Sequence, residues 1–299
     1  MDPTRSLRIL LTGPDGQVGW ECQRSLQALG QVHAVGRAEC DLGRADAIRA
    51  VVRSAAPDLI VNTAAYTAVD RAESEPDLAR AVNADAPAVL AEEARRLGVS
   101  LIHLSTDYVF DGTKTSPYVE DDECKPLSVY GRSKLAGEQA VLASGALALI
   151  LRTSWVYATR GHNFLRTMVR LAREREELRI VDDQWGAPTW ARSIAEAIAA
   201  IAARAGRDRT SIAASLAERG GVFHMTAAGR TNWHQFAQQL LQRVADPERR
   251  LRSIVSIPTK DYPTPARRPM NSVLDCTRLA RLWGVALPPW EKALELAVA

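Results

Sequence analysis

The stretch LRILLTGPDGQVGWECQRSL, residues 7–26, decides the fold class of this chain. The apolar run 7–12 predicts a strand, GPDGQVG (13–19) predicts a glycine turn, and 17–29 has helical spacing. In such a corner one glycine permits positive φ, a second lets backbone N–H groups approach a diphosphate, and the third lets the helix pack closely on the strand. The helix N-terminus then offers partial positive charge to an anion. We therefore predict a dinucleotide site, with candidate coenzyme-binding residues Gly13, Gly16, Gln17, Val18 and Gly19.

The glycine turn has one alternative interpretation. Its spacing, GxxGxxG, departs from the GxGxxG form in which the dinucleotide fingerprint is usually stated, and an ordinary strand–turn–helix corner is also compatible with it. Its place inside a βαβ unit at the start of the chain favours the dinucleotide interpretation.

Strands and helices alternate through the first half of the chain. The strand candidates are nearly continuous apolar runs, which is typical of a parallel sheet covered by helices on both faces. Right-handed βαβ crossovers then predict an α/β fold, a Rossmann-like doubly wound parallel sheet with a smaller C-terminal α/β substrate lobe. The predicted strands are 7–12, 32–35, 58–64, 99–104 and 147–152, and the predicted helices are 17–29, 42–54, 77–97 and 128–143.

The regular alternation of predicted strands and helices ends after about residue 153. Helical patterns at 164–176, 190–204 and 232–245 are separated by loops rich in glycine and proline. The segment 256–271 carries several prolines, and long irregular loops of this kind are often functional. We expect residues 1–153 to form the coenzyme domain with the catalytic pair and residues 154–299 to form mainly the substrate lobe, with the chain free to cross between them.

Composition excludes several classes of protein. The chain has 299 residues, 46% hydrophobic and 24% charged, with a formal net charge of +3. Such values fit a globular protein and give no electrostatic argument for a nucleic-acid partner. The four scattered cysteines form no CxxC pair, which favours a reducing compartment. We see no signal peptide and no apolar run long enough for a membrane span, so we expect a cytoplasmic protein without nucleic-acid or membrane partners.

Two further segments bear on the coenzyme. Where an acidic residue would hold an adenosine ribose, the second strand ends in Arg37, whose guanidinium suits a 2′-phosphate. We therefore favour NADPH and keep NADH possible, with a solvated surface arginine as the alternative. The remaining coenzyme candidates flank the adenine or follow the third strand: Asp41, Leu42, Ala64, Ala65, Tyr66 and Thr67.

The reacting groups are predicted on a helix and a strand end. Tyr130 and Lys134 are four residues apart and share a helical face. A nearby ammonium favours the phenolate, so we expect Lys134 to lower the pKa of Tyr130, making it a general acid, and to bind the nicotinamide ribose. Thr106 ends the fourth strand, where its hydroxyl can reach a substrate carbonyl. Tyr130, Lys134 and Thr106 are the candidate catalytic residues, since together they suit the reduction of a ketone.

At this point the chain resembles the extended short-chain dehydrogenase/reductase family and, within it, the dTDP-4-dehydrorhamnose reductases. The YxxxK pair and the glycines mark only the superfamily, whereas the other strings are more specific. The segments that carry the resemblance are GPDGQVGWE (13–21), DLIVNTAAYTAVDRAESEP (58–76), STDYVFDG (105–112), YGRSKLAGE (130–138), RTSWVY (152–157), DDQWGAPT (182–189) and YPTPARRPMNS (262–272).

The resemblance implies a reaction and further site residues. It implies reduction by NADPH or NADH of the C4 ketone of dTDP-4-dehydro-β-L-rhamnose, the last step of dTDP-L-rhamnose biosynthesis for surface polysaccharide such as lipopolysaccharide O-antigen. Tyr130 would protonate the developing alkoxide and Thr106 would hydrogen-bond the reacting oxygen. The substrate residues implied are Thr106, Asp107, Trp155 and Arg268, with Arg267 beside the last. Trp155 as a core residue and the arginines as solvated surface residues are the alternatives.

One departure from the family pattern concerns assembly. In the family a glutamate can follow GAPT and join Glu21 in a metal-bridged dimer contact, but Arg192 occupies that place here. Bound Mg²⁺ and that dimer are therefore in doubt, and we predict no metal ligands among the described motifs, the five histidines included, while a homodimer stays possible. Two other functions stay open: a nucleotide-sugar epimerase or dehydratase, and a non-catalytic NADP-binding regulatory subunit.

Overall fold

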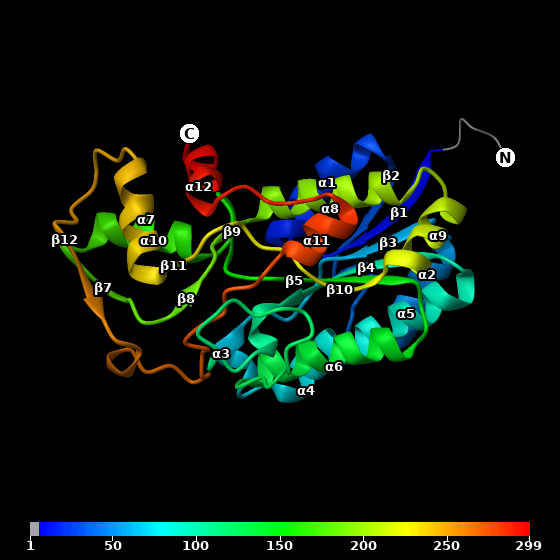
Figure 1. Ribbon diagram of the computed structural model, residues 1–299, viewed down its shortest axis with the longest axis horizontal. Coiled ribbons are helices and arrows are strands. Elements are labelled where there is room, and N and C mark those ends of the chain that lie inside the picture. Colours follow the sequence, from blue (N-terminus) through cyan, green and yellow to red (C-terminus); the bar gives the residue numbers. More distant parts are fainter. Residues whose placement is uncertain (1–5) are drawn as a thin grey trace.

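A parallel sheet of six strands forms the centre of the larger lobe in the computed structural model, which describes residues 6–299 (Figure 1). The strand order is β10-β5-β4-β3-β1-β2, so the chain turns to opposite sides of β1 and creates a switch point between β1 and β3. Sheets of this type bind ligands at the carboxyl edge of the switch point. The strands are β1 (Leu7–Thr12), β2 (Gly30–Val35), β3 (Leu59–Asn62), β4 (Ser100–Thr106), β5 (Ala148–Thr153) and β10 (Gly221–His224).

Helices cover both faces of this sheet. Because successive strand residues point to opposite faces, Ile9 and Leu11 face one helix layer and Leu10 faces the other. The first layer contains α1 (Gln17–Ser25), α8 (Ala191–Ala205), α9 (Arg209–Arg219) and α11 (Thr277–Trp283), and the second contains α2 (Ala45–Ala55), α5 (Ala86–Leu97) and α6 (Val129–Ala143) (Figure 1).

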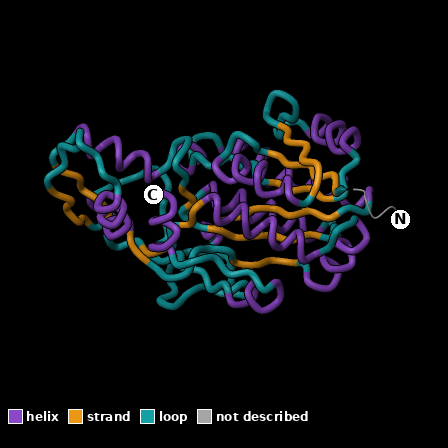
Figure 2. Tube along the Cα trace, turned by 90° about the horizontal axis from the view of Figure 1, so that it is seen from above, coloured by secondary structure: helices purple, strands orange, loops and turns teal. Residues whose placement is uncertain are grey.

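The smaller lobe lies beyond one end of the large sheet in both views (Figure 2). Its core surrounds Phe236 and includes Tyr157, Leu165 and Trp290. Three two-stranded sheets connect its parts. Its elements are α7 (Phe164–Glu174), α10 (Trp233–Arg243), α12 (Trp290–Val298), β6 (Val156–Tyr157), β7 (Glu177–Val181), β8 (Trp185–Gly186), β9 (Thr189–Trp190), β11 (Thr231–Asn232) and β12 (Ser253–Ile257).

The predicted doubly wound sheet is confirmed, with two differences in detail. The sheet also contains β10, and α8, α9 and α11 pack on it, so elements from beyond residue 153 complete the larger lobe. The helix predicted over 77–97 is divided into α4 (Pro76–Arg80), a π-helical turn (Ala81–Asp85) and α5. Within residues 6–299 we find no helix that combines the length and the apolarity needed to cross a membrane.

Candidate active site

The glycine turn is fixed by two close backbone approaches. Gly13 has φ of +74°, and a Cβ there would lie 2.8 Å from the backbone of Ala64. A Cβ on Gly19 would lie 2.0 Å from the Gly13 carbonyl oxygen, so the start of α1 packs directly against the turn. Gly16 precedes the first helical residue, Gln17, and its N–H donates to the Gly13 carbonyl at 3.1 Å. The turn therefore has the open backbone and the helix N-terminus that a dinucleotide diphosphate requires.

The segment after β3 packs against the glycine turn, where Ala64 lies against Gly13. The Asn83 side chain accepts from the Tyr66 N–H at 2.8 Å and donates to the Tyr66 carbonyl at 3.0 Å. The Tyr66 hydroxyl donates to Glu75 at 2.6 Å. These contacts hold the segment in one position, and it carries the candidates Ala64, Ala65, Tyr66 and Thr67 past the glycine turn.

The end of β2 carries the residues predicted to meet the adenosine. Arg37 is exposed there and directly follows Gly36, whose N–H donates to Glu39 at 3.3 Å. Asp41 accepts from the Gly43 N–H at 3.0 Å, and Leu42 packs against the core beneath. The position suits a group that reaches the ribose, and the preference for a 2′-phosphate stays a prediction.

Tyr130 is held between two neighbouring elements. It lies near the start of α6, which is capped by Ser128 accepting from the Gly131 N–H at 3.1 Å. A Cβ on Gly131 would lie 2.2 Å from the Tyr108 carbonyl oxygen, so α6 packs closely on that segment. The Tyr108 and Tyr130 rings meet edge to face at 5.6 Å. The Thr106 hydroxyl lies close enough to the Tyr130 phenol to lower its pKa, and the bond predicted between these two hydroxyls stays a prediction.

The predicted lowering of the Tyr130 pKa is wrong, because the net shift is upward and Lys134 is not among the groups that cause it. Burial raises the pKa of Tyr130 to about 12; the Thr106 hydroxyl opposes the rise and the Asp107 carboxylate adds to it. The Lys134 Nζ donates to the Leu104 carbonyl at 2.7 Å, and burial lowers the pKa of Lys134 to about 8. Helical spacing placed the two residues on one face but gave no information on burial, which dominates both shifts.

Asp107 lies beside this pair and is 1% exposed. Its carboxylate accepts from the Thr106 hydroxyl at 3.0 Å. Burial raises the pKa of Asp107 to about 7, although hydrogen bonds from Ser272 and Thr106 favour the carboxylate. The site thus contains a carboxyl group that titrates near neutrality, in contact with the hydroxyl predicted to bind the substrate oxygen.

Trp155 forms an aromatic wall in a strained backbone conformation. It has φ of +46°, which is uncommon for a residue with a side chain. Its ring stacks on Trp233 with centroids 3.6 Å apart, and a Cβ on Gly186 would lie 2.5 Å from it. The indole therefore sits between a second tryptophan and a glycine, half-buried directly after β5.

Arg268 is already engaged in the protein. Its guanidinium forks onto Asp70, with N–O distances of 3.1 and 2.8 Å, and it also bonds Thr264. Arg267 is exposed. The charge of Arg268 acts on the pKa of Tyr108, so the proline-rich loop reaches the neighbourhood of the reacting groups. The sequence did not indicate Asp70 as the partner, because the two residues are far apart in the chain.

Sequence reasoning also missed a set of buried polar residues beneath the site. His103 appeared only as a core residue of a strand, and it is indeed fully buried. For His103 the one available signal was its position toward the carboxyl end of a strand, and many other residues share that position. The missed residues are Asn62, Asn83, His103, Glu138 and Arg152, of which the last two form an ion pair of 2.7 Å.

The region around Arg192 differs from the family pattern as expected. Arg192 pairs with Glu196 at 2.9 Å on its own helix. Among residues 6–299 there is no cluster of three His, Cys, Asp or Glu side chains able to hold a metal ion.

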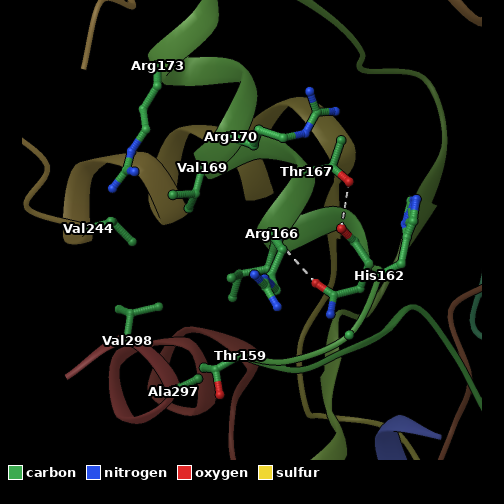
Figure 3. Close-up of a pocket in the computed structure, with 13 residues that line it drawn as sticks. Thr159, His162, Arg166, Thr167, Val169, Arg170, Arg173, Val244, Ala297 and Val298 are labelled. Atoms are coloured by element: carbon green, nitrogen blue, oxygen red, sulfur yellow. Dashed lines mark hydrogen bonds between the residues drawn. The ribbon is translucent and has the colours of Figure 1, made fainter. Parts of the chain in front are cut away.

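A separate cavity of about 770 Å³ lies in the smaller lobe between α7 and the end of α12, lined by residues that include Arg166, Val169 and Val298 (Figure 3). It contains none of the predicted site residues.

A glycine corner at the switch point, a Tyr-x-x-x-Lys helix and a threonine at the next strand end define an extended short-chain dehydrogenase/reductase. The family model for the RmlD substrate binding domain matches residues 7–299. The dTDP-4-dehydrorhamnose reductase of Burkholderia thailandensis is 52% identical over 296 residues, covering 98% of both chains. That of Escherichia coli K12 is 44% identical over 292 residues, covering 95% of both. The chain therefore belongs to the dTDP-4-dehydrorhamnose reductase family.

Solved structures agree with this assignment. A dTDP-4-dehydrorhamnose reductase from Bacillus anthracis in complex with NADP matches with a TM-score of 0.87 and 32% identity, covering 98% of each chain. A dTDP-glucose 4,6-dehydratase from Streptomyces venezuelae, with NAD bound, has a TM-score of 0.76 at 19% identity and shares the fold.

Proposed function

We propose that this protein reduces the C4 ketone of dTDP-4-dehydro-β-L-rhamnose to the alcohol, with NADPH or NADH as reductant. The nearness of the Thr106 hydroxyl to the Tyr130 phenol at the carboxyl edge of the sheet, close enough to act on the pKa of the phenol, is the observation that carries the proposal. It brings a protonated phenol and a second hydroxyl to one point, as reduction of a carbonyl requires. Family membership supplies the sugar nucleotide, and we propose that the product serves surface polysaccharide synthesis.

The glycine turn and the segment after β3 would hold the coenzyme. Gly13, Gly16 and Gly19 have no side chains to block the coenzyme diphosphate, and Arg37, which is exposed at the end of β2, is the proposed contact of the adenosine phosphate. When bound, the reduced nicotinamide supplies the hydride. Lys134 lies one helical turn from Tyr130 and is the proposed contact of the adjoining ribose.

The protein's own residues supply the proton and hold the ketone. A pKa of about 12 keeps Tyr130 fully protonated at neutral pH, so it can donate to the substrate oxygen as negative charge develops there. On substrate binding, the single proton of the Thr106 hydroxyl would turn from the Asp107 carboxylate to the same oxygen and keep that oxygen in line with the phenol. Trp155 provides a flat wall for the sugar, and Arg268 is proposed to contact the diphosphate.

The test is an assay with the purified protein, the 4-keto sugar nucleotide and NADPH, followed by loss of the reduced-nicotinamide absorbance. Tyr130→Phe removes the proton donor alone, so we expect turnover to fall about 10²–10⁴-fold with coenzyme affinity near normal. Thr106→Val, which removes the other hydroxyl, is the matched variant and should also lose turnover. A Phe variant as fast as the parent would contradict the role of Tyr130.

The same assay separates the other functions. An epimerase or dehydratase that retains NAD⁺ would consume no NADPH in proportion to substrate, and a regulatory subunit would show no turnover and would capture a stoichiometric partner protein. We further propose a cytoplasmic location and a homodimer. Sedimentation of the purified protein measures the second, and a monomer at micromolar concentration would refute it.

A further inference from the structure

A row of buried polar side chains runs beneath the catalytic helix. Thr12, Asn62 and His103 are register neighbours on β1, β3 and β4, so their side chains lie side by side near the carboxyl ends of the strands. Each is at most 1% exposed. The row ends at Lys134, whose Nζ lies 3.5 Å from His103 Nε2. Polar groups so deeply buried need partners, and their directions fix where the protons lie.

The Asn62 amide can take only one orientation. Its Oδ1 lies 3.2 Å from the Ala64 backbone N–H and 2.6 Å from the Thr12 hydroxyl. A backbone N–H can only donate, so the amide oxygen must stay on that side. The NH₂ group then points at His103 Nδ1, 2.9 Å away.

This orientation determines the tautomer of His103. Because Asn62 donates to Nδ1, that nitrogen must carry a lone pair, and a neutral imidazole then carries its proton on Nε2. Complete burial and the nearby Lys134 charge hold the pKa of His103 well below its usual range, so the ring stays neutral. The Nε2–H therefore faces the Lys134 nitrogen.

An N–H aimed at the lysine favours the neutral amine, which can accept it, over the ammonium, which cannot. Lys134 keeps one acceptor, the Leu104 carbonyl. The Glu138 carboxylate favours the ammonium, but Arg152 and Ser105 already engage it. The titratable groups nearest Lys134 are His103 on β4 and Tyr130 and Glu138 on α6. Two further charged groups act through neighbours: Arg152 on β5 pairs with Glu138, and Asp107 contacts Thr106.

We propose that His103 is a positioning residue that weakens the hold of Lys134 on its proton, through a tautomer imposed by Asn62. The inference rests on the proposed function for its effect on catalysis. Lys134 then loses its proton at a lower pH than the phenol beside it. The part of the alkaline limb of the pH–rate profile that lies above the titration of Asp107 accordingly belongs to Lys134, and the hydrogen bonds from Asn62 through His103 set the pH at which it falls.

The tautomer can be tested without substrate or coenzyme. In protein labelled with ¹⁵N-histidine, the His103 signals are assigned by their loss in His103→Gln. We expect a protonated Nε2 and a bare Nδ1, unchanged from pH 5 to pH 9. A proton on Nδ1, or a ring that becomes doubly protonated in this range, would overturn the inference even if the enzyme is active.

The effect on Lys134 is tested by the pH dependence of kcat. In Asn62→Asp a carboxylate replaces the donor, so His103 should move its proton to Nδ1 and accept from the lysine at Nε2. In His103→Gln an amide oxygen can accept from the lysine directly. We expect the alkaline limb to move up by about one pH unit in each, the size of one hydrogen bond to a charged group, with KM for the coenzyme nearly unchanged.

The matched control is His224→Gln. His224 is equally buried, on β10, but its Nδ1 lies against the Tyr118 carbonyl and not against Lys134. We expect this variant to lose stability and to keep the parent's pH profile. Equal shifts in both histidine variants, or no shift in folded His103→Gln, would refute the role of His103. Absence of ketone reduction by the parent at every pH would instead refute the proposed function, and the tautomer measurement would still decide this inference.

Discussion

The coenzyme half and the substrate half of the candidate site are built in different ways. The coenzyme half depends on the backbone of one short segment, where Gly19 leaves no room for a Cβ against Gly13 and Gly13 leaves none against Ala64. The substrate half is assembled from side chains far apart in the chain, such as Trp155 on Trp233 and Asp70 on Arg268. Motifs describe the first kind of construction well and the second kind poorly, because only the first is local.

The largest expected effect comes from Gly19→Ala in the coenzyme half. The new Cβ would meet the Gly13 carbonyl oxygen at 2.0 Å, so α1 must move away from the turn. We expect a loss of about 1–3 kcal/mol in the free energy of unfolding and at least a tenfold loss in coenzyme affinity. Denaturant unfolding and coenzyme titration measure the two effects.

Gly98→Ala is the control for this change. Gly98 has φ of +64° with nothing within 4 Å, so a Cβ adds backbone strain without a clash. It should cost about 1–2 kcal/mol in stability and leave coenzyme affinity intact. If both variants weaken the coenzyme equally, the close approach at Gly19 is not what shapes the site.

A smaller effect is expected for Arg268→Ala in the substrate half. Loss of charge-assisted hydrogen bonds to a diphosphate is worth about 1.5–3 kcal/mol, so KM for the sugar nucleotide should rise about 10–100-fold. Arg267→Ala, at the exposed neighbour, should change KM only a few-fold. Asp70→Asn separates the roles, because it removes the carboxylate charge that faces Arg268 and one of the two oxygens that accept from its guanidinium, while Arg268 keeps its own charge. An equal rise in KM for Asp70→Asn would assign Arg268 to loop positioning alone.

The last prediction concerns the pH dependence of stability at Asp107, where the two halves meet. Its pKa of about 7 lies above the unfolded value near 4, so the folded protein binds more protons between these limits. Stability should therefore fall as pH rises from about 4 to 7, and Asp107→Asn should remove that part of the slope. Urea unfolding across this range measures it, and parallel slopes for parent and variant would contradict the raised pKa.

Sequence reasoning predicted most of the fold and about half of the site. Apolar runs located five strands of the sheet, because four of them are buried on both faces and only the edge strand β2 is partly exposed, and the glycine spacing located the coenzyme turn. It missed β10, because only two residues of Gly221–His224 are buried and the segment has no continuous apolar run like that of β3. It also gave the wrong pKa direction for Tyr130, because the spacing of residues on a helix says nothing about how deeply the helix face is covered.

The late arrival of β10 has a consequence for synthesis. The ribosome delivers the whole Tyr–Lys helix well before Gly221–His224 and α8, which together close one sheet edge and cover one sheet face. Until then Leu149 and Leu151 have no helix layer over them, and β5 is an unprotected edge strand. The nascent chain therefore holds Tyr130 and Lys134 in an incomplete scaffold until residue 224 has been added.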